Sequence, residues 1–182
     1  MKKIKSALTL CSLSVSFALP AAEGLNQSFV EFGFTTESTG SSNGAGLNIK
    51  GGTGVHKNID LVAGFYHTQA SEEVNGVKYN GKLFNYTAGV RLKNEFRISD
   101  SISVEPFLPF GVMYSTGDVV FSEYIQDANS VIPYYGIGSS VIFNDDIYVN
   151  AELLKYNYEH TIHGNILYTD PIQVSLSFGF RF

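Results

Sequence analysis

The sequence closes with Val174-Ser175-Leu176-Ser177-Phe178-Gly179-Phe180-Arg181-Phe182. Apolar residues alternate there with small or polar ones, without a break, up to a terminal phenylalanine. A period of two places every second side chain on the same face of an extended strand. The chain therefore ends in a predicted β-strand with one apolar face and one polar face.

The same alternation recurs in seven stretches further upstream. The eight runs cover residues 28–36, 47–56, 61–68, 84–93, 102–115, 134–143, 147–158 and 166–182. Each is about as long as, or longer than, the roughly 9–11 residues that a tilted membrane-spanning strand needs. The pattern predicts an all-β fold, an eight-stranded antiparallel transmembrane β-barrel.

The polar faces of the runs indicate which side points inward. Glycine falls on these faces at positions 33, 52, 54, 64, 89, 111, 136, 138 and 179, and only Gly51 breaks the rule. A narrow barrel interior crowds its side chains and favours small residues there, whereas a β-sandwich would turn its apolar face inward. We therefore expect an apolar outer band around a polar, ion-paired interior. Its predicted members are Glu31, Lys50, Arg91, Lys93, Glu105, Glu152 and Arg181.

The connections support the barrel independently. Short turns are expected near residues 57–58, 99–101 and 144–146, and long polar loops over 37–44, 70–82, 116–130 and 157–165. Strict alternation of short and long connections is typical of outer-membrane barrels, which have short periplasmic turns and longer external loops. Pro106 and Pro109 lack ladder donors, so they predict a bulge in the fifth strand.

The N-terminus has the order of a secretory signal. Lys2, Lys3 and Lys5 precede an apolar stretch over 7–19, and Pro20-Ala21-Ala22 follows. We predict a signal peptide over residues 1–22, cleaved near Ala18, Ala21 or Ala22, and a barrel domain over 23–182. The only cysteine, Cys11, would leave with the signal. Loss of three of the 12 basic residues leaves 9 against 17 acidic ones, a balance of −8 that argues against nucleic-acid binding.

The chain resembles two known patterns. Its ending, with Phe178, Phe180 and Phe182, resembles the assembly signal recognised by the machinery that folds outer-membrane barrels. Gly46-Leu-Asn-Ile-Lys50, Tyr86-Thr-Ala-Gly-Val-Arg-Leu92, Tyr135-Gly-Ile-Gly-Ser139 and Gly179-Phe-Arg-Phe182 resemble the Ail/OmpX-type family of small outer-membrane barrels. The resemblance implies location in the cell outer membrane and a role, such as adhesion or serum resistance, exerted through external loops.

Candidate chemistry is sparse. Glu159-His160-Thr161-Ile162-His163 could orient a base or hold a cation, but it is interpreted as a solvated loop segment. His56 is expected in the polar interior and His67 at the membrane interface. Tyr114, Tyr124, Tyr156, Tyr158 and Tyr168 are expected in an aromatic girdle. No catalytic, cofactor or metal site is predicted.

These features favour a non-enzymatic surface barrel, adhesin-like or envelope-protective, that is expected to be a monomer. Its expected partners are outer-membrane lipid, the assembly machinery and a host-surface or envelope ligand at the loops. The alternative is a lipid-modifying enzyme of the lipid A deacylase or acyltransferase type, although no His-x-Ser-Asn pattern occurs. A diffusion pore is disfavoured because side chains fill an eight-stranded barrel.

Overall fold

The structure is a computed structural model that describes residues 27–38, 43–74, 77–121, 124–162, 165–169 and 171–182. Within these strands the side chains of 70–80, 118–129 and 158–169 are not described. No helix in the described part of the chain is long and apolar enough to cross a membrane. The predicted signal peptide lies outside the described residues.

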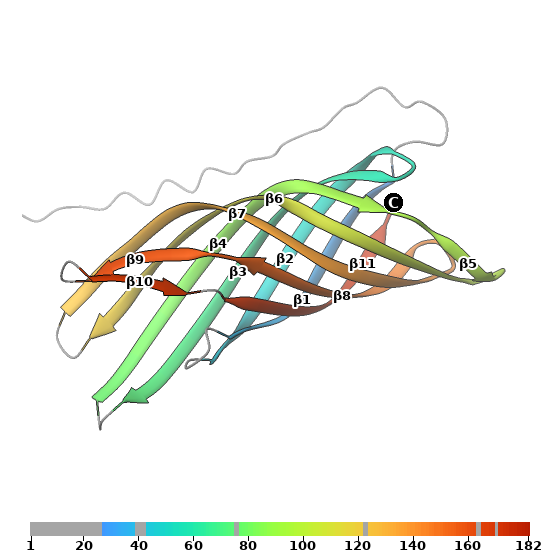
Figure 1. Ribbon diagram of the computed structural model, residues 1–182. Coiled ribbons are helices and arrows are strands. Elements are labelled where there is room, and N and C mark those ends of the chain that lie inside the picture. Colours follow the sequence, from blue (N-terminus) through green and yellow to red (C-terminus); the bar gives the residue numbers. More distant parts are fainter. Residues whose placement is uncertain (1–26, 39–42, 75–76, 122–123, 163–164, 170) are drawn as a thin grey trace, which may run out of the picture.

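The described chain is built from β-strands (Figure 1). They are β1 (Ser28–Ser38), β2 (Asn43–His56), β3 (Ile59–Val74), β4 (Val77–Lys93), β5 (Phe96–Ser99), β6 (Ile102–Phe121), β7 (Tyr124–Phe143), β8 (Ile147–Tyr156), β9 (Tyr158–Ile162), β10 (Asn165–Thr169) and β11 (Ile172–Arg181).

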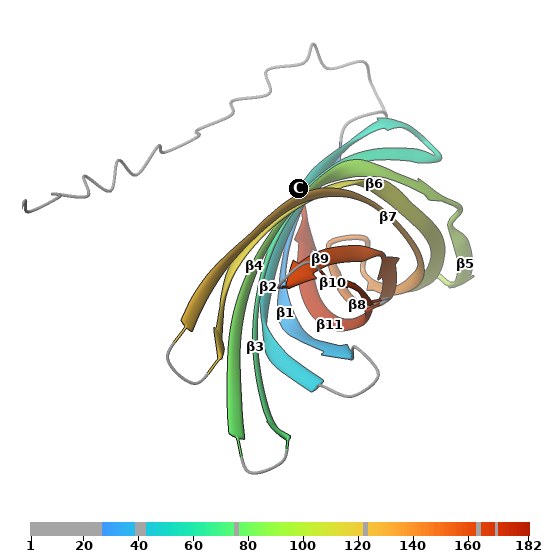
Figure 2. The same ribbon diagram turned by 60° about the vertical axis from the view of Figure 1, so that its left-hand side comes forward.

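Pairing closes the sheet into a ring. The hydrogen-bonded order is β4-β3-β2-β1-β11-β8-β7-β6-β5, and β4 also pairs with β6. Since β4 and β5 pair with successive parts of β6, they share one position in the wall. The result is a closed, eight-stranded antiparallel barrel, as the sequence predicted, and Figure 2 shows its curved wall. Strands β9 and β10 form a separate hairpin beyond it.

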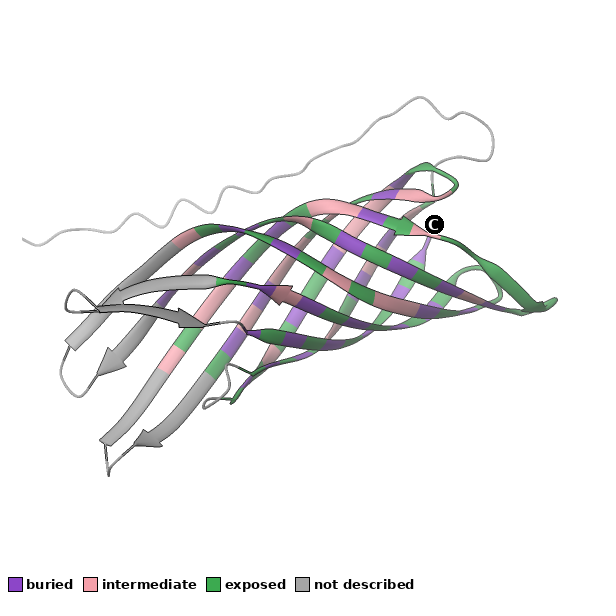
Figure 3. Cartoon of the chain, viewed as in Figure 1, coloured by how far each residue is buried: buried purple, intermediate pink, exposed green. Residues whose placement is uncertain are grey.

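The two faces of the wall differ in chemistry. Along β8 and β11 exposed and buried residues alternate almost without interruption, as the banding in Figure 3 shows. Apolar side chains pair across the outer face of the β1–β11 seam, with the exposed Phe32 opposite the exposed Phe178 and the partly exposed Val30 opposite Phe180. The buried face carries Glu31, Lys50 and other polar groups. An apolar outside around a polar inside is the arrangement that a lipid environment requires.

The two ends of the barrel also differ. One end, the turn end, holds the short connections at 57–58, 100–101 and 144–146 and the C-terminus, where Phe182 pairs with Ser28. The other, the hairpin end, extends further than predicted. Strands β3 and β4 pair out to Val74 and Val77, and β6 and β7 pair out to Phe121 and Tyr124.

The expected long loops were therefore largely wrong. Most of 70–82, 116–130 and 157–165 is strand, and the predicted runs 147–158 and 166–182 are each divided between a barrel strand and the β9–β10 hairpin. The short β5 was not predicted. Pairing along a hairpin needs only backbone groups, so it continues where the side-chain alternation is too weak to indicate a strand.

The bulge predicted at the prolines was also wrong. Pairing between β6 and β7 lapses at Leu108 and Pro109 but resumes in the same register, with Phe107 opposite Gly138 and Phe110 opposite Tyr135. Pro106 lies opposite the break between β4 and β5, where its carbonyl accepts from the Asn94 amide at 3.2 Å. The prolines, which lack backbone N–H donors, thus interrupt the β6–β7 ladder without shifting its register.

Candidate functional site in the barrel lumen

A buried ion cluster occupies the middle of the lumen. Lys50 Nζ lies 2.7 Å from Glu31 Oε1, and Arg91 Nη2 lies 3.0 Å from the same oxygen. Asn150 donates to the other Glu31 oxygen at 2.8 Å. All four residues are buried, and Arg91 is only 2% exposed. Charges so far from water are tolerated only when each is paired and hydrogen-bonded.

The same cluster reaches a second carboxylate. Lys50 Nζ donates to Glu152 Oε1 at 3.0 Å, and the Tyr66 hydroxyl donates to that oxygen at 3.1 Å. The Arg91 guanidinium also lies 4.3 Å from the centre of the Phe107 ring, within cation–π range. The cluster therefore links β1, β2, β3, β4, β6 and β8 through side chains across the lumen.

A second ion cluster lies nearer the turn end. Arg181 Nη2 contacts Glu105 Oε1 at 2.7 Å, and Lys93 Nζ lies 3.0 Å from Asp60 Oδ1 and 3.4 Å from Glu105 Oε2. The structure thus brings all seven residues predicted for the polar interior into these two clusters. Asp60 was missed, although it shares the inward parity of Gly64 on the same strand.

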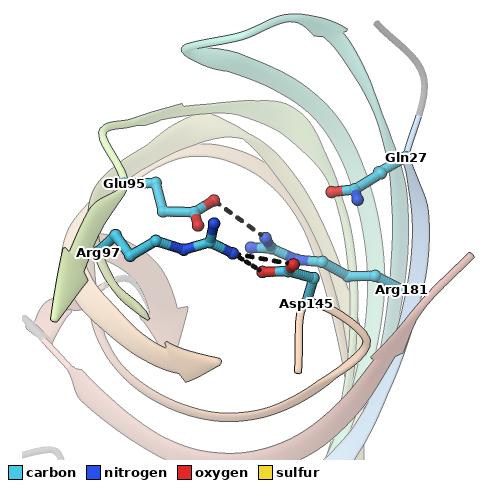
Figure 4. A pocket seen from close by; sticks show the side chains of 5 residues that line it. All are labelled: Gln27, Glu95, Arg97, Asp145 and Arg181. Atoms are coloured by element: carbon cyan, nitrogen blue, oxygen red, sulfur yellow. Dashed lines mark hydrogen bonds and ion pairs between the residues drawn. The ribbon is translucent and has the colours of Figure 1, made fainter. Parts of the chain in front are cut away.

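At the turn end the lumen opens into a cavity of about 440 Å³ (Figure 4). Gln27, Glu95, Arg97, Asp145 and Arg181 line it. Arg97 Nη2 donates to both oxygens of Asp145 at 2.9 Å, and Arg181 Nη1 lies 3.6 Å from Glu95 Oε2. Arg97 and Asp145 form a balanced pair at this mouth, whereas Arg181 is shared between Glu95 here and Glu105 deeper in the lumen.

An apolar layer lies above the central ion cluster, towards the hairpin end. It is formed by the buried side chains of Tyr66, Met113, Ile132, Tyr134, Leu154 and Tyr156. This layer was not predicted, because the inward face was expected to be polar. Strand parity could have identified Leu154, which is two residues from the inward Glu152. Together, the ions and apolar groups pack the described lumen, as expected for eight strands.

Inward aromatic rings explain two of the inward glycines. A Cβ added at Gly138 would collide with the Phe107 ring, and one at Gly179 would collide with the Tyr148 ring. The predicted crowding is therefore real, and large rings rather than charged side chains cause it at these two positions. Glycine on one strand makes room for a ring on another.

Several single-residue predictions are corrected. His56 is exposed beside the turn, where its Nδ1 accepts from the Asn58 amide at 3.3 Å, because the bulge between Gly54 and His56 changes the inward parity. Tyr156 points into the lumen and is buried, whereas Tyr114 is exposed on the outer face as predicted. Tyr86 and Tyr135, which were not assigned to the girdle, are also exposed there.

Of the remaining candidates, only His67 has a described side chain. His67 stacks on Phe84 on the outer face with ring centres 4.6 Å apart. The side chains of Glu159, His160, Tyr124, Tyr158 and Tyr168 lie outside the described set, as does all of His163. Among described residues, no group of three or more histidine, cysteine, aspartate or glutamate side chains could hold a metal ion.

The three phenylalanines of the predicted assembly signal all point outward from the last strand. Phe178 and Phe180 pack edge to face with ring centres 4.9 Å apart. Phe182 is 75% exposed, and its backbone exchanges two hydrogen bonds with Ser28, of 2.9 and 3.0 Å. The terminal ring therefore lies at the rim of the outer band, at the seam where the first and last strands meet.

A closed antiparallel barrel with an apolar exterior and an ion-paired interior defines an integral membrane barrel of the outer-membrane class. Residues 7–182 match the family model described as outer membrane protein beta-barrel domain, and the chain belongs to this family. Its fold is that of the small, eight-stranded outer-membrane barrels of the Ail/OmpX type, and it is located in the outer membrane. The turn end is accordingly periplasmic and the hairpin end external.

Solved structures show the same fold at low identity. OprG from Pseudomonas aeruginosa aligns with a TM-score of 0.63 and 14% identity over 87% of this chain and 96% of that one. The Neisserial surface protein A gives 0.57 and 13% over 86% and 95%. Ail of Yersinia pestis, in complex with the heparin analogue sucrose octasulfate, gives 0.56 and 16% over 87% and 99%. No curated protein matches the chain.

Proposed function

We propose that this protein is a non-enzymatic surface barrel whose external hairpins contact host or envelope components, in an adhesin-like or envelope-protective role. The observation that carries the proposal is that neighbouring strands extend to different distances at the external end of the barrel. Pairing of β7 with β8 ends at Tyr134 opposite Tyr156, while β7 continues to Tyr124 paired with β6 alone. In the described chain, this stretch of β7 forms ladder hydrogen bonds with β6 alone, although part of β7 lies close to β9.

A free strand edge carries unpaired backbone donors and acceptors that can bind another extended polypeptide. Soluble proteins usually shorten or cover such edges, so a stretch of this length favours a protein partner. A polyanion is a poorer partner, because the chain carries a formal charge of −5 and the external segments are rich in acidic residues such as Glu72, Glu73 and Asp127. The packed lumen argues against a transport role.

The test shortens one hairpin at a time. Replacing residues 117–128 with Asn-Gly joins the paired residues Thr116 and Asn129 by a two-residue turn. The matched control replaces 70–81 with Asn-Gly between the paired Gln69 and Lys82. We expect cells displaying the first variant to lose attachment to host cells or survival in serum, at an unchanged level in the outer membrane, and cells with the second to keep both.

Two outcomes would count against this role. Attachment and serum survival that do not differ between cells with and without the gene would remove its basis. A gene-dependent change in the acyl chains of lipid A would instead favour the lipid-modifying enzyme.

A further inference from the structure

The charges in the lumen do not all find partners. The two ion clusters pair the cations of Lys50, Arg91, Lys93 and Arg181 with the anions of Glu31, Asp60, Glu105 and Glu152. Glu37 is a ninth charged residue facing the lumen, only 4% exposed, and no cation of the described residues contacts it. It lies six residues beyond Glu31 on β1, towards the external end.

The surroundings of Glu37 supply oxygen atoms but leave one carboxylate oxygen alone. Thr68 Oγ1 donates to Glu37 Oε2 at 3.0 Å, and Tyr156 also interacts with the carboxyl. Glu37 Oε1 is buried without a hydrogen-bond partner. Directly across the sheet, Gln173 is fully buried, accepts from the Tyr156 hydroxyl at 3.1 Å and has an unpartnered amide nitrogen.

A buried carboxylate without a counter-charge is costly, so a proton or a cation must neutralise it. A proton on Oε1 would have at most one acceptor, the Gln173 amide oxygen after rotation of the amide. A cation beside Oε1 would bind the lone pairs of several surrounding oxygens directly. The Gln173 amide can turn its oxygen towards Glu37 while its nitrogen donates to Tyr156, since amide orientation follows the hydrogen-bond network.

We propose that Glu37 holds a monovalent alkali-metal cation at the external end of the lumen, with the oxygens of Gln173, Tyr156 and Thr68 around it. One carboxylate balances one positive charge, which favours Na⁺ or K⁺ over a divalent ion. Oxygen-only groups are the ligands that hard cations prefer. The site is independent of the proposed surface role, because it depends on buried side chains and not on the free edge of β7.

The proposal is tested by heat unfolding of the full-length protein in detergent micelles. NaCl, KCl and choline chloride are compared at one ionic strength, because choline has the same charge but is too bulky for a buried site. We expect the wild-type midpoint to be about 2–4 °C higher in NaCl or KCl than in choline chloride. Glu37→Gln keeps the size and polarity of the side chain and should remove the difference.

Asp145→Asn is the matched control, since it neutralises an exposed acid at the opposite, periplasmic mouth and should leave the salt dependence intact. As a direct readout, wild-type protein should broaden the ²³Na resonance in a way that K⁺ reverses, and Glu37→Gln should not. Equal wild-type midpoints in the three salts, or a difference that persists in Glu37→Gln, would overturn the proposal. An infrared band of a protonated carboxyl that disappears in Glu37→Gln would assign the neutralisation to a proton and would overturn it as well.

Discussion

Arg91 contributes both charge and packing, since its guanidinium contacts Glu31 and also lies 4.8 Å from the centre of the Phe29 ring. Arg91→Leu removes one partner of a buried carboxylate, so we expect it to lower the free energy of unfolding by about 3 kcal/mol. The neighbouring Val90→Thr, on the outer face, should cost less. Denaturant unfolding in micelles measures both, and equal costs would mean that the inner and outer faces were reversed.

Gly138 tests the crowding of the lumen at a single Cβ. Gly138→Ala forces the Phe107 ring to move, and we expect a loss of about 1–3 kcal/mol in the free energy of unfolding. Gly81→Ala is the matched control, because its Cβ would meet nothing within 4 Å. Adding Phe107→Leu to Gly138→Ala should recover part of the loss. No recovery would show that the backbone at Gly138, and not the ring, limits the site.

At the scale of the element, the last strand is expected to have two separable roles. Deleting Phe182 removes a rim side chain, worth at most about 1.5–3 kcal/mol, and two backbone hydrogen bonds to Ser28. If the terminal phenylalanine is also the assembly signal, the truncated protein should refold in detergent yet be depleted from the outer membrane of cells. Immunoblots of membrane fractions and refolding yields separate these roles.

Phe143→Ala is the control for that deletion, because it removes another exposed ring from the outer face near the turn end. It should reach the outer membrane at a nearly normal level. Normal surface levels of the chain without Phe182 would contradict the signal role. Failure of that chain to refold in detergent would make the residue structural.

For the whole molecule, closure of the sheet into a barrel determines how it resists unfolding. Every strand of the barrel wall is paired on both sides over its central part, so no strand can leave the sheet without breaking the hydrogen bonds to both of its neighbours. We expect the folded protein to resist SDS at room temperature and to migrate differently on a gel before and after boiling. Identical mobility of membrane-embedded protein under the two conditions would contradict a closed barrel.

Much of this architecture was predictable because strand parity is a local property. The alternation at Val174–Phe182 and in the seven earlier runs determined the number of wall positions and which face meets lipid. Inward glycines supported the same assignment, and the seven predicted interior charges lie in the lumen. The alternation of apolar and polar side chains can be recognised from neighbouring residues alone, so no tertiary information is needed to find it.

Other features depended on contacts between residues far apart in the chain. The sequence could not indicate that Lys50 pairs with both Glu31 and Glu152, or that Gly138 leaves room for Phe107. It also did not reveal the apolar layer at Leu154 or the extension of β3, β4, β6 and β7 beyond the barrel. Which inward side chains meet is set by strand stagger and ring closure, and these arise only when all eight wall positions are assembled.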